Sequence, residues 1–183
     1  MKAKVLALVG ASLLIPSAAG AVSVAILGNP AARACYEAAD SNRLEPGALE
    51  TCNRALESDV MRYEDRMATL VNRGIVKFRM RDFDAANADF DAVLLSNPDQ
   101  PDALINKGIV MLAAGGSVDG ALQLLNRGLE GRPARPWVGY YGRAVAHELE
   151  GRDGDAYANY QKARELRPNW QLAQDALARF SRS

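Results

Sequence analysis

Apolar side chains recur at intervals of three and four residues over much of the chain, which is the spacing of an amphipathic helix. Between residues 67 and 80 these apolar positions are Leu70, Val71, Ile75 and Phe78. Similar patterns predict helices at 67–80, 83–95, 118–129, 137–149 and 153–166. Ser117 is a suitable N-cap for the helix that follows it. The pattern therefore predicts an all-α chain built from helix pairs joined by short turns.

Three segments of the chain repeat with a period close to 35 residues. Four sets of positions keep this interval: Pro98, Pro133 and Pro168; Ala86, Ala121 and Ala156; Phe90, Leu125 and Tyr160; and Val93, Gly128 and Ala163. Four sets in one register exceed what chance would produce. A fixed period of this length is the signature of stacked units that bury a continuous core between them.

These units resemble tetratricopeptide repeats, a family of helix-turn-helix units about 34 residues long. The matching stretches are Asn72-Arg73-Gly74, 82–86, Phe90 and Pro98; then Asn106-Lys107-Gly108, Ala121 and Pro133; then Gly151-Arg152-Asp153, Ala156, 160–163 and Pro168. The departures from the family pattern are Lys77, Val93 and Gly128. The resemblance is to bacterial, exported members of the family, and it implies an α-solenoid.

Within that solenoid we expect repeats at residues 60–98, 99–133 and 134–168, followed by a capping helix in 169–183. The apolar positions of this last helix, which are expected to cover the open face of the third repeat, are Leu172, Ala176, Leu177 and Phe180. A degenerate first helix pair is expected at 30–59, because Ala48, Cys52 and Ala55 precede Ala86, Phe90 and Val93 by 38 residues each.

The first 21 residues have the layout of a secretory signal peptide. A short basic segment is followed by an apolar core from Val5 to Ile15 and by small residues up to Ala21. We expect cleavage after Ala21, with a cut after Ala19 as the second choice, and export, most simply to the periplasm. The alternative is an uncleaved membrane anchor, because residues 5–27 carry no charge and are long enough to span a bilayer.

The chain has two cysteines, Cys35 and Cys52. In an oxidising compartment an even pair at this separation predicts a structural disulfide. In the register of the degenerate repeat both cysteines fall where its two helices meet. A redox-active or metal-binding pair is the alternative, but the C-x-x-C spacing and a nearby histidine are both missing.

The resemblance also implies a concave groove lined by the first helix of each repeat. The residues expected to line it and to bind a partner segment are Val71, Asn72, Ile75, Phe78, Ile105, Asn106, Ile109, Leu112, Tyr141 and Val145. Exposed aliphatic side chains in a row usually mark a binding surface. The alternative is that these positions belong to the core between repeats, or that the extended N-terminal segment at 22–29 covers them.

Charge and motifs argue against enzymatic and nucleic-acid functions. The chain has 22 basic and 22 acidic side chains, so it lacks the net positive charge that phosphate binding favours. Residues 22–131 carry 11 basic and 16 acidic side chains, a net charge of −5, whereas residues 132–183 carry 9 and 6, a net charge of +3. His147 is the single histidine, and no nucleotide-binding, hydrolase or zinc-protease motif occurs. We expect no catalytic, cofactor or metal site.

The sequence thus predicts an exported, non-catalytic scaffold or adaptor that binds a protein or peptide through its concave groove. An inner-membrane-tethered scaffold with an uncleaved N-terminal helix is one alternative, and an accessory subunit of an envelope enzyme complex is another. Membrane contact is expected only if the N-terminal segment stays uncleaved. Self-association and the identity of the partner are left open.

Overall fold

The computed structural model describes residue 23 and residues 30–41, 44–58 and 61–180. The predicted signal peptide at 1–21 and most of the predicted extended segment at 22–29 lie outside these residues, so cleavage after Ala21 stays a prediction. Across the residues that are described, no helix is both long enough and apolar enough to cross a membrane.

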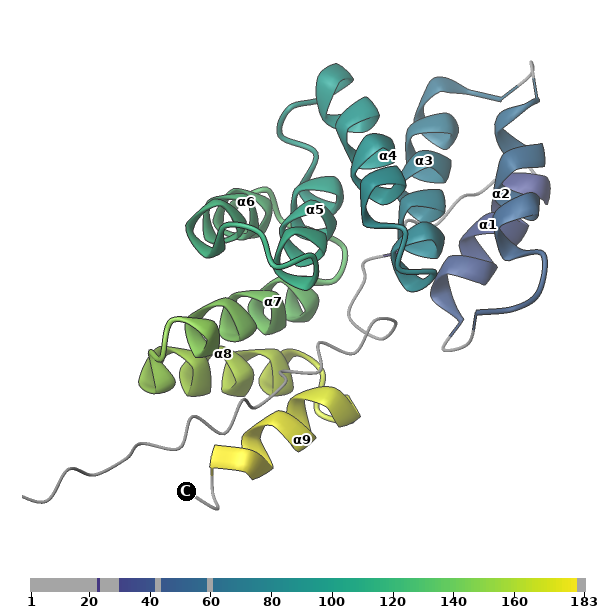
Figure 1. Cartoon of the computed structure of the whole chain (residues 1–183). Coiled ribbons are helices and arrows are strands. Elements are labelled where there is room, and N and C mark those ends of the chain that lie inside the picture. The colour runs from purple at the N-terminus through teal and green to yellow at the C-terminus, as the bar shows by residue number, and fades with distance from the viewer. Residues whose placement is uncertain (1–22, 24–29, 42–43, 59–60, 181–183) are drawn as a thin grey trace, which may run out of the picture.

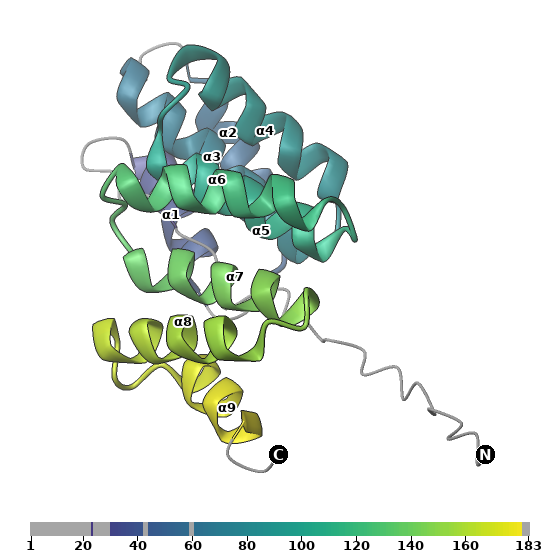
Figure 2. The same ribbon diagram turned by 90° about the vertical axis from the view of Figure 1, so that its left-hand side faces the viewer.

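The described residues form nine α-helices and no β-strand, which confirms the all-α prediction. The helices are α1 (Pro30–Asp40), α2 (Ala48–Leu56), α3 (Tyr63–Arg79), α4 (Phe83–Ser96), α5 (Pro101–Ala113), α6 (Val118–Glu130), α7 (Pro136–Leu149), α8 (Asp153–Leu166) and α9 (Gln171–Phe180). Each helix pair packs against the next, from α1–α2 to α7–α8, and α9 packs on α8 (Figure 1). Figure 2 shows α6, α7, α8 and α9 as successive layers of this stack.

Side-chain capping accounts for three helix starts, those of α4, α5 and α6. The Ser117 hydroxyl accepts a hydrogen bond from the Gly120 backbone N–H at 3.1 Å, which confirms its predicted capping role. Asp82 caps α4 in the same way through the Ala85 N–H. The helix predicted from residue 67 begins earlier, at Tyr63, because its first turn is acidic and polar and so carries no apolar period. Acidic side chains at a helix N-terminus interact favourably with the helix dipole.

The turns within the repeats share a left-handed backbone. This conformation occurs at Arg81, Gly115 and Gly151, the equivalent residues of the three turns, with φ angles of 63°, 73° and 71°. Glycine adopts it at no steric cost, whereas a residue with a Cβ atom is destabilised there. The first of the three turns therefore carries a strained arginine where the other two have glycine.

The repeating positions form the continuous core. Phe90, Leu125 and Tyr160 are fully buried, and the alanines one turn earlier in the same helices are buried with them. Small residues let the paired helices approach: a Cβ atom on Gly74 would lie 2.6 Å from the Phe90 ring. Glycine is needed at position 128 for the same reason, because a Cβ atom there would lie 2.7 Å from the Ile105 side chain. One departure from the family pattern is thus a packing requirement.

The last helix closes the stack. Ala176 and Leu177 of α9 are buried against the α7–α8 pair, whereas Leu172 and Phe180 are partly buried. Trp170, which precedes α9, is also buried, and its ring centroid lies 5.1 Å from that of Tyr141. The apolar face predicted for this segment therefore packs on the core.

Candidate interaction surfaces

The predicted disulfide is present. Cys35 of α1 and Cys52 of α2 are joined at an S–S distance of 2.07 Å with their Cα atoms 4.7 Å apart, and both residues are fully buried. The bond joins α1 and α2, the shortest helix pair of the stack. The other residues buried in this pair are mostly small, Ala39 and Ala48 among them. Arg79 adds a tie to α3 by donating to the Ala38 carbonyl at 3.2 Å. The first helix pair is thereby held as one body on α3.

The ten residues expected to line a concave groove are all buried. Four lie on α3, four on α5 and two on α7, and none is more than 7% exposed. The structure therefore does not show them as an open row of aliphatic side chains. Partner binding by this set stays a prediction that would require the packed face to become accessible.

Contacts with neighbouring repeats explain this burial. Ile105 lies against the backbone positions of Gly128 and Gly139, so it fills the space between α5, α6 and α7. Ile109 lies against Gly142 in the same way. The sequence alternative, in which these positions belong to the core between repeats, describes the observed packing of both isoleucines.

The third repeat buries a polar contact among its aromatic rings. The Tyr160 hydroxyl donates to Glu148 at 2.6 Å, and Arg179 of α9 donates to the same carboxylate at 3.1 Å. Burial raises the pKa of Tyr141 to about 12 and raises the pKa of Tyr160 further, with the Glu148 carboxylate adding to the second shift. Both phenols therefore stay protonated at physiological pH and act as packing groups.

A charged network connects the first and fourth helix pairs, α1–α2 and α7–α8. Arg135, the residue before α7, forms an ion pair with Asp40 at the end of α1 and lies within 3.5 Å of the Tyr36 hydroxyl. Ser23 is the described residue of the 22–29 segment; it is buried and donates to Asp40 at 2.8 Å. Asp40 and Arg135 are far apart in sequence, so this contact holds the end of α1 close to the start of α7.

The pKa values of two acids near this network, Asp40 and Asp102, are shifted in opposite directions. Burial alone would raise the pKa of Asp40, but the hydrogen bonds from Ser23 and Arg135 and the charges of Arg135 and Arg79 together lower it. Burial raises the pKa of Asp102, and the Ala134 N–H, the Gln100 side chain and the charge of Arg135 only partly offset this effect. Asp40 therefore favours the folded state when it is ionised.

The described residues contain no group of three or more His, Cys, Asp or Glu side chains that could hold a metal ion. His147 is buried on α7, where its Nδ1 atom lies 3.4 Å from Glu150 in the turn that follows. The histidine therefore takes part in packing and in a local polar contact.

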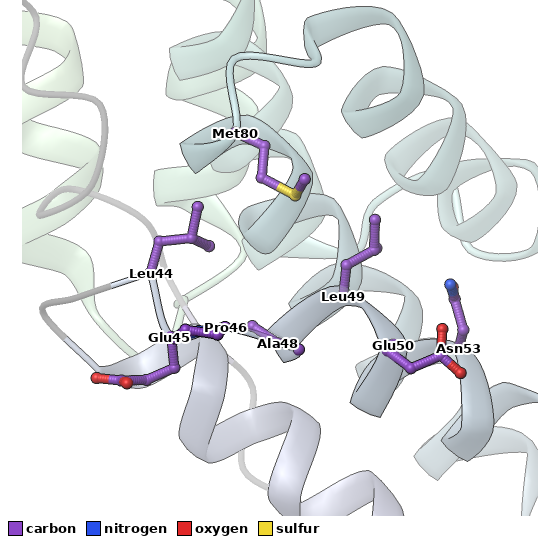
Figure 3. Close-up of a pocket in the computed structure, with 9 residues that line it drawn as sticks. Leu44, Glu45, Pro46, Ala48, Leu49, Glu50, Asn53 and Met80 are labelled. Carbon is purple, nitrogen blue, oxygen red and sulfur yellow. The ribbon is translucent and has the colours of Figure 1, made fainter.

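An open apolar groove lies at the edge of the first helix pair. It encloses about 430 Å³ and is lined by residues 44–50, Asn53 and Met80. Figure 3 shows Leu44, Leu49 and Met80 projecting around the hollow from the loop before α2, from α2 and from the end of α3. Leu44 and Met80 are 45% and 48% exposed. We call this surface the α2–α3 groove.

The sequence pattern did not single out the α2–α3 groove or the Asp40–Arg135 contact. Each brings together residues from elements that are not predicted to face one another by helical period alone. A usable signal was present only for the loop: Pro46-Gly47 marks a turn, and Gly47 has a φ angle of 81° at the start of α2.

Comparison with known families gives one match. The model of the family described as Tetratricopeptide repeat matches residues 71–136, from within α3 to the first residue of α7. Neither the curated proteins nor the solved structures yield a match. The family match supports a tetratricopeptide repeat protein, and with the nine helices of the described residues it shows an all-α fold of the tetratricopeptide-like helical-repeat type.

Proposed function

We propose that the chain is a non-catalytic scaffold for protein–protein interaction that works after export, in the periplasm or an equivalent oxidising compartment. Tetratricopeptide repeats generally mediate protein–protein contacts, and the family match supports that reading. The buried Cys35–Cys52 bond supports an oxidising compartment, because disulfides persist there and are rare in reducing ones. The N-terminal sequence, with its expected cleavage after Ala21, supports the same location.

The observation that carries the proposal is a stacked helical-repeat body that leaves an apolar groove open at one edge. A surface hollow formed by three large apolar side chains is a feature of binding sites rather than of plain solvated surface. The predicted groove residues are buried, so we place the protein-binding surface on the exposed parts of the repeats.

In-cell crosslinking tests the scaffold function. Wild-type protein and the Met80→Glu variant are captured from the cell of origin, and the crosslinked proteins are identified by mass spectrometry. We expect specific proteins to be captured by the wild type, and those that use the α2–α3 groove to be lost from the variant. Leu95→Glu is the matched control, because Leu95 is 87% exposed on α4 and outside the groove. A wild type that captures nothing above the background of an unrelated exported protein would contradict the scaffold function.

N-terminal sequencing of the same material tests the export proposal. A first residue of Val22 is the expected result. A chain that begins at Met1 and sediments with membranes would contradict cleavage and would favour the tethered scaffold.

The double change Ile105→Glu and Ile109→Glu is unsuitable as a binding test. It would place two carboxylates in the core between α5, α6 and α7, where burying an unpaired charge is strongly destabilising. We expect loss of helical circular dichroism, and a native-like spectrum would show that this face is open in solution.

A further inference from the structure

The α2–α3 groove has a definite chemical character. Its largest side chains are apolar, and its charged members are the carboxylates Glu45 and Glu50. Neither carboxylate takes part in an ion pair among the described residues, and the nine residues that line the groove include no basic side chain. Glu50 lies in the first turn of α2, where its negative charge also interacts favourably with the helix dipole. The groove therefore suits an apolar side chain that is flanked by cations.

The chain itself presents such a group at the end of α8. Seven large hydrophobic side chains are exposed in the described residues: Leu44, Tyr63, Met80, Leu95, Leu149, Tyr157 and Leu166. Two of these line the groove. Leu166 is 40% exposed and lies between Arg164 and Arg167, and the carboxylate next to it, Glu165, is held by Lys162 at 3.0 Å.

The four other exposed hydrophobics lack this pattern. Tyr63 lies between Glu64 and Arg62, whose charge is paired with Asp65, and Leu149 lies between Glu148 and Glu150. Neither Tyr157 nor Leu95 has a cation within three residues along the chain. These groups therefore bring either carboxylates, which are unfavourable beside the carboxylates of the groove, or no cation to pair with them. The Leu166 segment is thus the best complement to the groove among the exposed apolar groups of the described chain.

The cations beside Leu166 are exposed and in place. Arg164 forms no ion pair among the described residues. Arg167 lies over the Trp137 ring, with its guanidinium carbon 5.3 Å from the ring centroid, which holds the positive charge beside the helix end. Residues 132–183, which include this end, have a net charge of 9 − 6 = +3, whereas residues 22–131, which include the groove, have a net charge of 11 − 16 = −5.

We propose that the protein self-associates through a contact between unlike surfaces: the α8 end of one copy docks in the α2–α3 groove of a second copy. Leu166 fills the apolar hollow, and Arg164 and Arg167 face Glu45 and Glu50. The walls of the groove are suited to this because the disulfide and the contacts with α3 fix α2 before docking. The contact goes beyond the scaffold function and does not depend on it.

The contact is small, so we expect a dissociation constant between about 10 µM and about 1 mM. Sedimentation velocity of the protein as purified from the cell, over that concentration range, is the first measurement. We expect association that weakens at least about tenfold between roughly 0.05 M and roughly 0.5 M salt, because exposed charge pairs are screened. A wild type that stays monomeric over the whole range would overturn the proposal and leave the groove to a different protein.

Two variants test the pairing of unlike surfaces. Met80→Glu removes the groove function and Leu166→Glu removes the docking group, so each variant alone should associate at least about tenfold more weakly. A mixture of the two should regain association, because the intact groove of the Leu166→Glu chain can accept the intact α8 end of the Met80→Glu chain. A mixture as weak as either variant alone would overturn the proposal, since it would indicate a contact between like surfaces or none at all.

Charge exchange gives a second route that leaves the apolar residues unchanged. Glu45→Arg with Glu50→Arg should weaken association, and so should Arg164→Glu with Arg167→Glu, whereas mixing these two proteins should restore it. All four of these positions are exposed, so the loss of the Arg167–Trp137 contact and of the Glu50 charge at the start of α2 should lower the melting temperature only slightly. Leu95→Glu is the control and should associate like the wild type. Equal weakening by Leu95→Glu would overturn the assigned surfaces.

Discussion

The first and fourth helix pairs, α1–α2 and α7–α8, reach stability by different means. Helices α1 and α2 have 11 and 9 residues, and their facing side chains are small, so a buried disulfide joins them. Helices α7 and α8 have 14 residues each, pack between α6 and α9, and enclose the aromatic rings of Tyr141 and Tyr160. The α1–α2 pair has little apolar area to bury and is stabilised by a covalent bond. The α7–α8 pair has large aromatic side chains and is stabilised by their burial.

Removing the central ring of the α7–α8 pair should have the largest effect. Tyr160 is fully buried, so Tyr160→Ala should lower the free energy of unfolding by about 3–5 kcal/mol, the usual cost of deleting a large aromatic side chain from a core. Chemical denaturation followed by circular dichroism measures the change. Tyr157→Ala, on the exposed side of the same helix, should cost much less. Equal costs would mean that α8 does not pack as described.

Removing the disulfide should have the next largest effect. Cys35→Ser should lower the free energy of unfolding by about 3 kcal/mol, the chain-entropy estimate for a loop of this size. The variant should also be insensitive to reductant, unlike the wild type, and should expose the Cys52 thiol to labelling after local opening. Native wild-type protein that already labels at both cysteines would refute the bond.

The turns should respond with opposite signs. Gly151→Ala should cost about 1–2 kcal/mol, because alanine is disfavoured at a positive φ and no neighbouring atom lies within 4 Å to add a packing effect. Arg81→Gly should raise the melting temperature slightly, since the relief of backbone strain exceeds the loss of the Arg81–Phe83 ring contact. A lower melting temperature for Arg81→Gly would show that the ring contact outweighs the strain.

Breaking the contact between the first and fourth pairs should have the smallest effect. Asp40→Asn should cost about 0.2–1 kcal/mol at neutral pH, because the Asp40–Arg135 pair is partly exposed. The folded-state pKa of Asp40 lies below its ordinary value of 3.8, so this contribution is present above pH 3.8 and is lost as the pH falls through the lowered pKa.

Unfolding curves of the wild type and Asp40→Asn at several pH values measure the difference, which should vanish at low pH. Glu37→Gln is the control, because its ion pair with Arg33 spans one exposed turn of α1 and connects no repeats. A difference that grows as the pH falls would contradict the assigned direction of the Asp40 pKa.

Most of the helices, the repeat register and the cysteine pair could be predicted from the sequence. The prediction of a helix at 153–166 coincides with α8, and Ser117 caps α6 as expected. These features depend on residues that are near in sequence or that repeat at a fixed interval. The start of α3 was missed by four residues, because its first turn is polar and shows no apolar period.

The predicted binding surface depends on packing that the helical period does not contain. Helical period tells which residues share a face of a helix, and Ile105 and Ile109 do share one. It does not tell what packs on that face. The small residues Gly139 and Gly142 of the next repeat let α7 approach closely enough to bury both isoleucines.

By itself, the sequence determined the all-α class, the 35-residue register, the turns and the pairing of the two cysteines, because each is encoded in local preferences or in a fixed period. Only the tertiary structure decided which apolar faces are buried and which stay open. The α2–α3 groove depends on how α2 packs beside α3, and the Asp40–Arg135 pair depends on the sum of small rotations between successive helix pairs. That sum is a property of packing between repeats, and no single segment of the chain contains it.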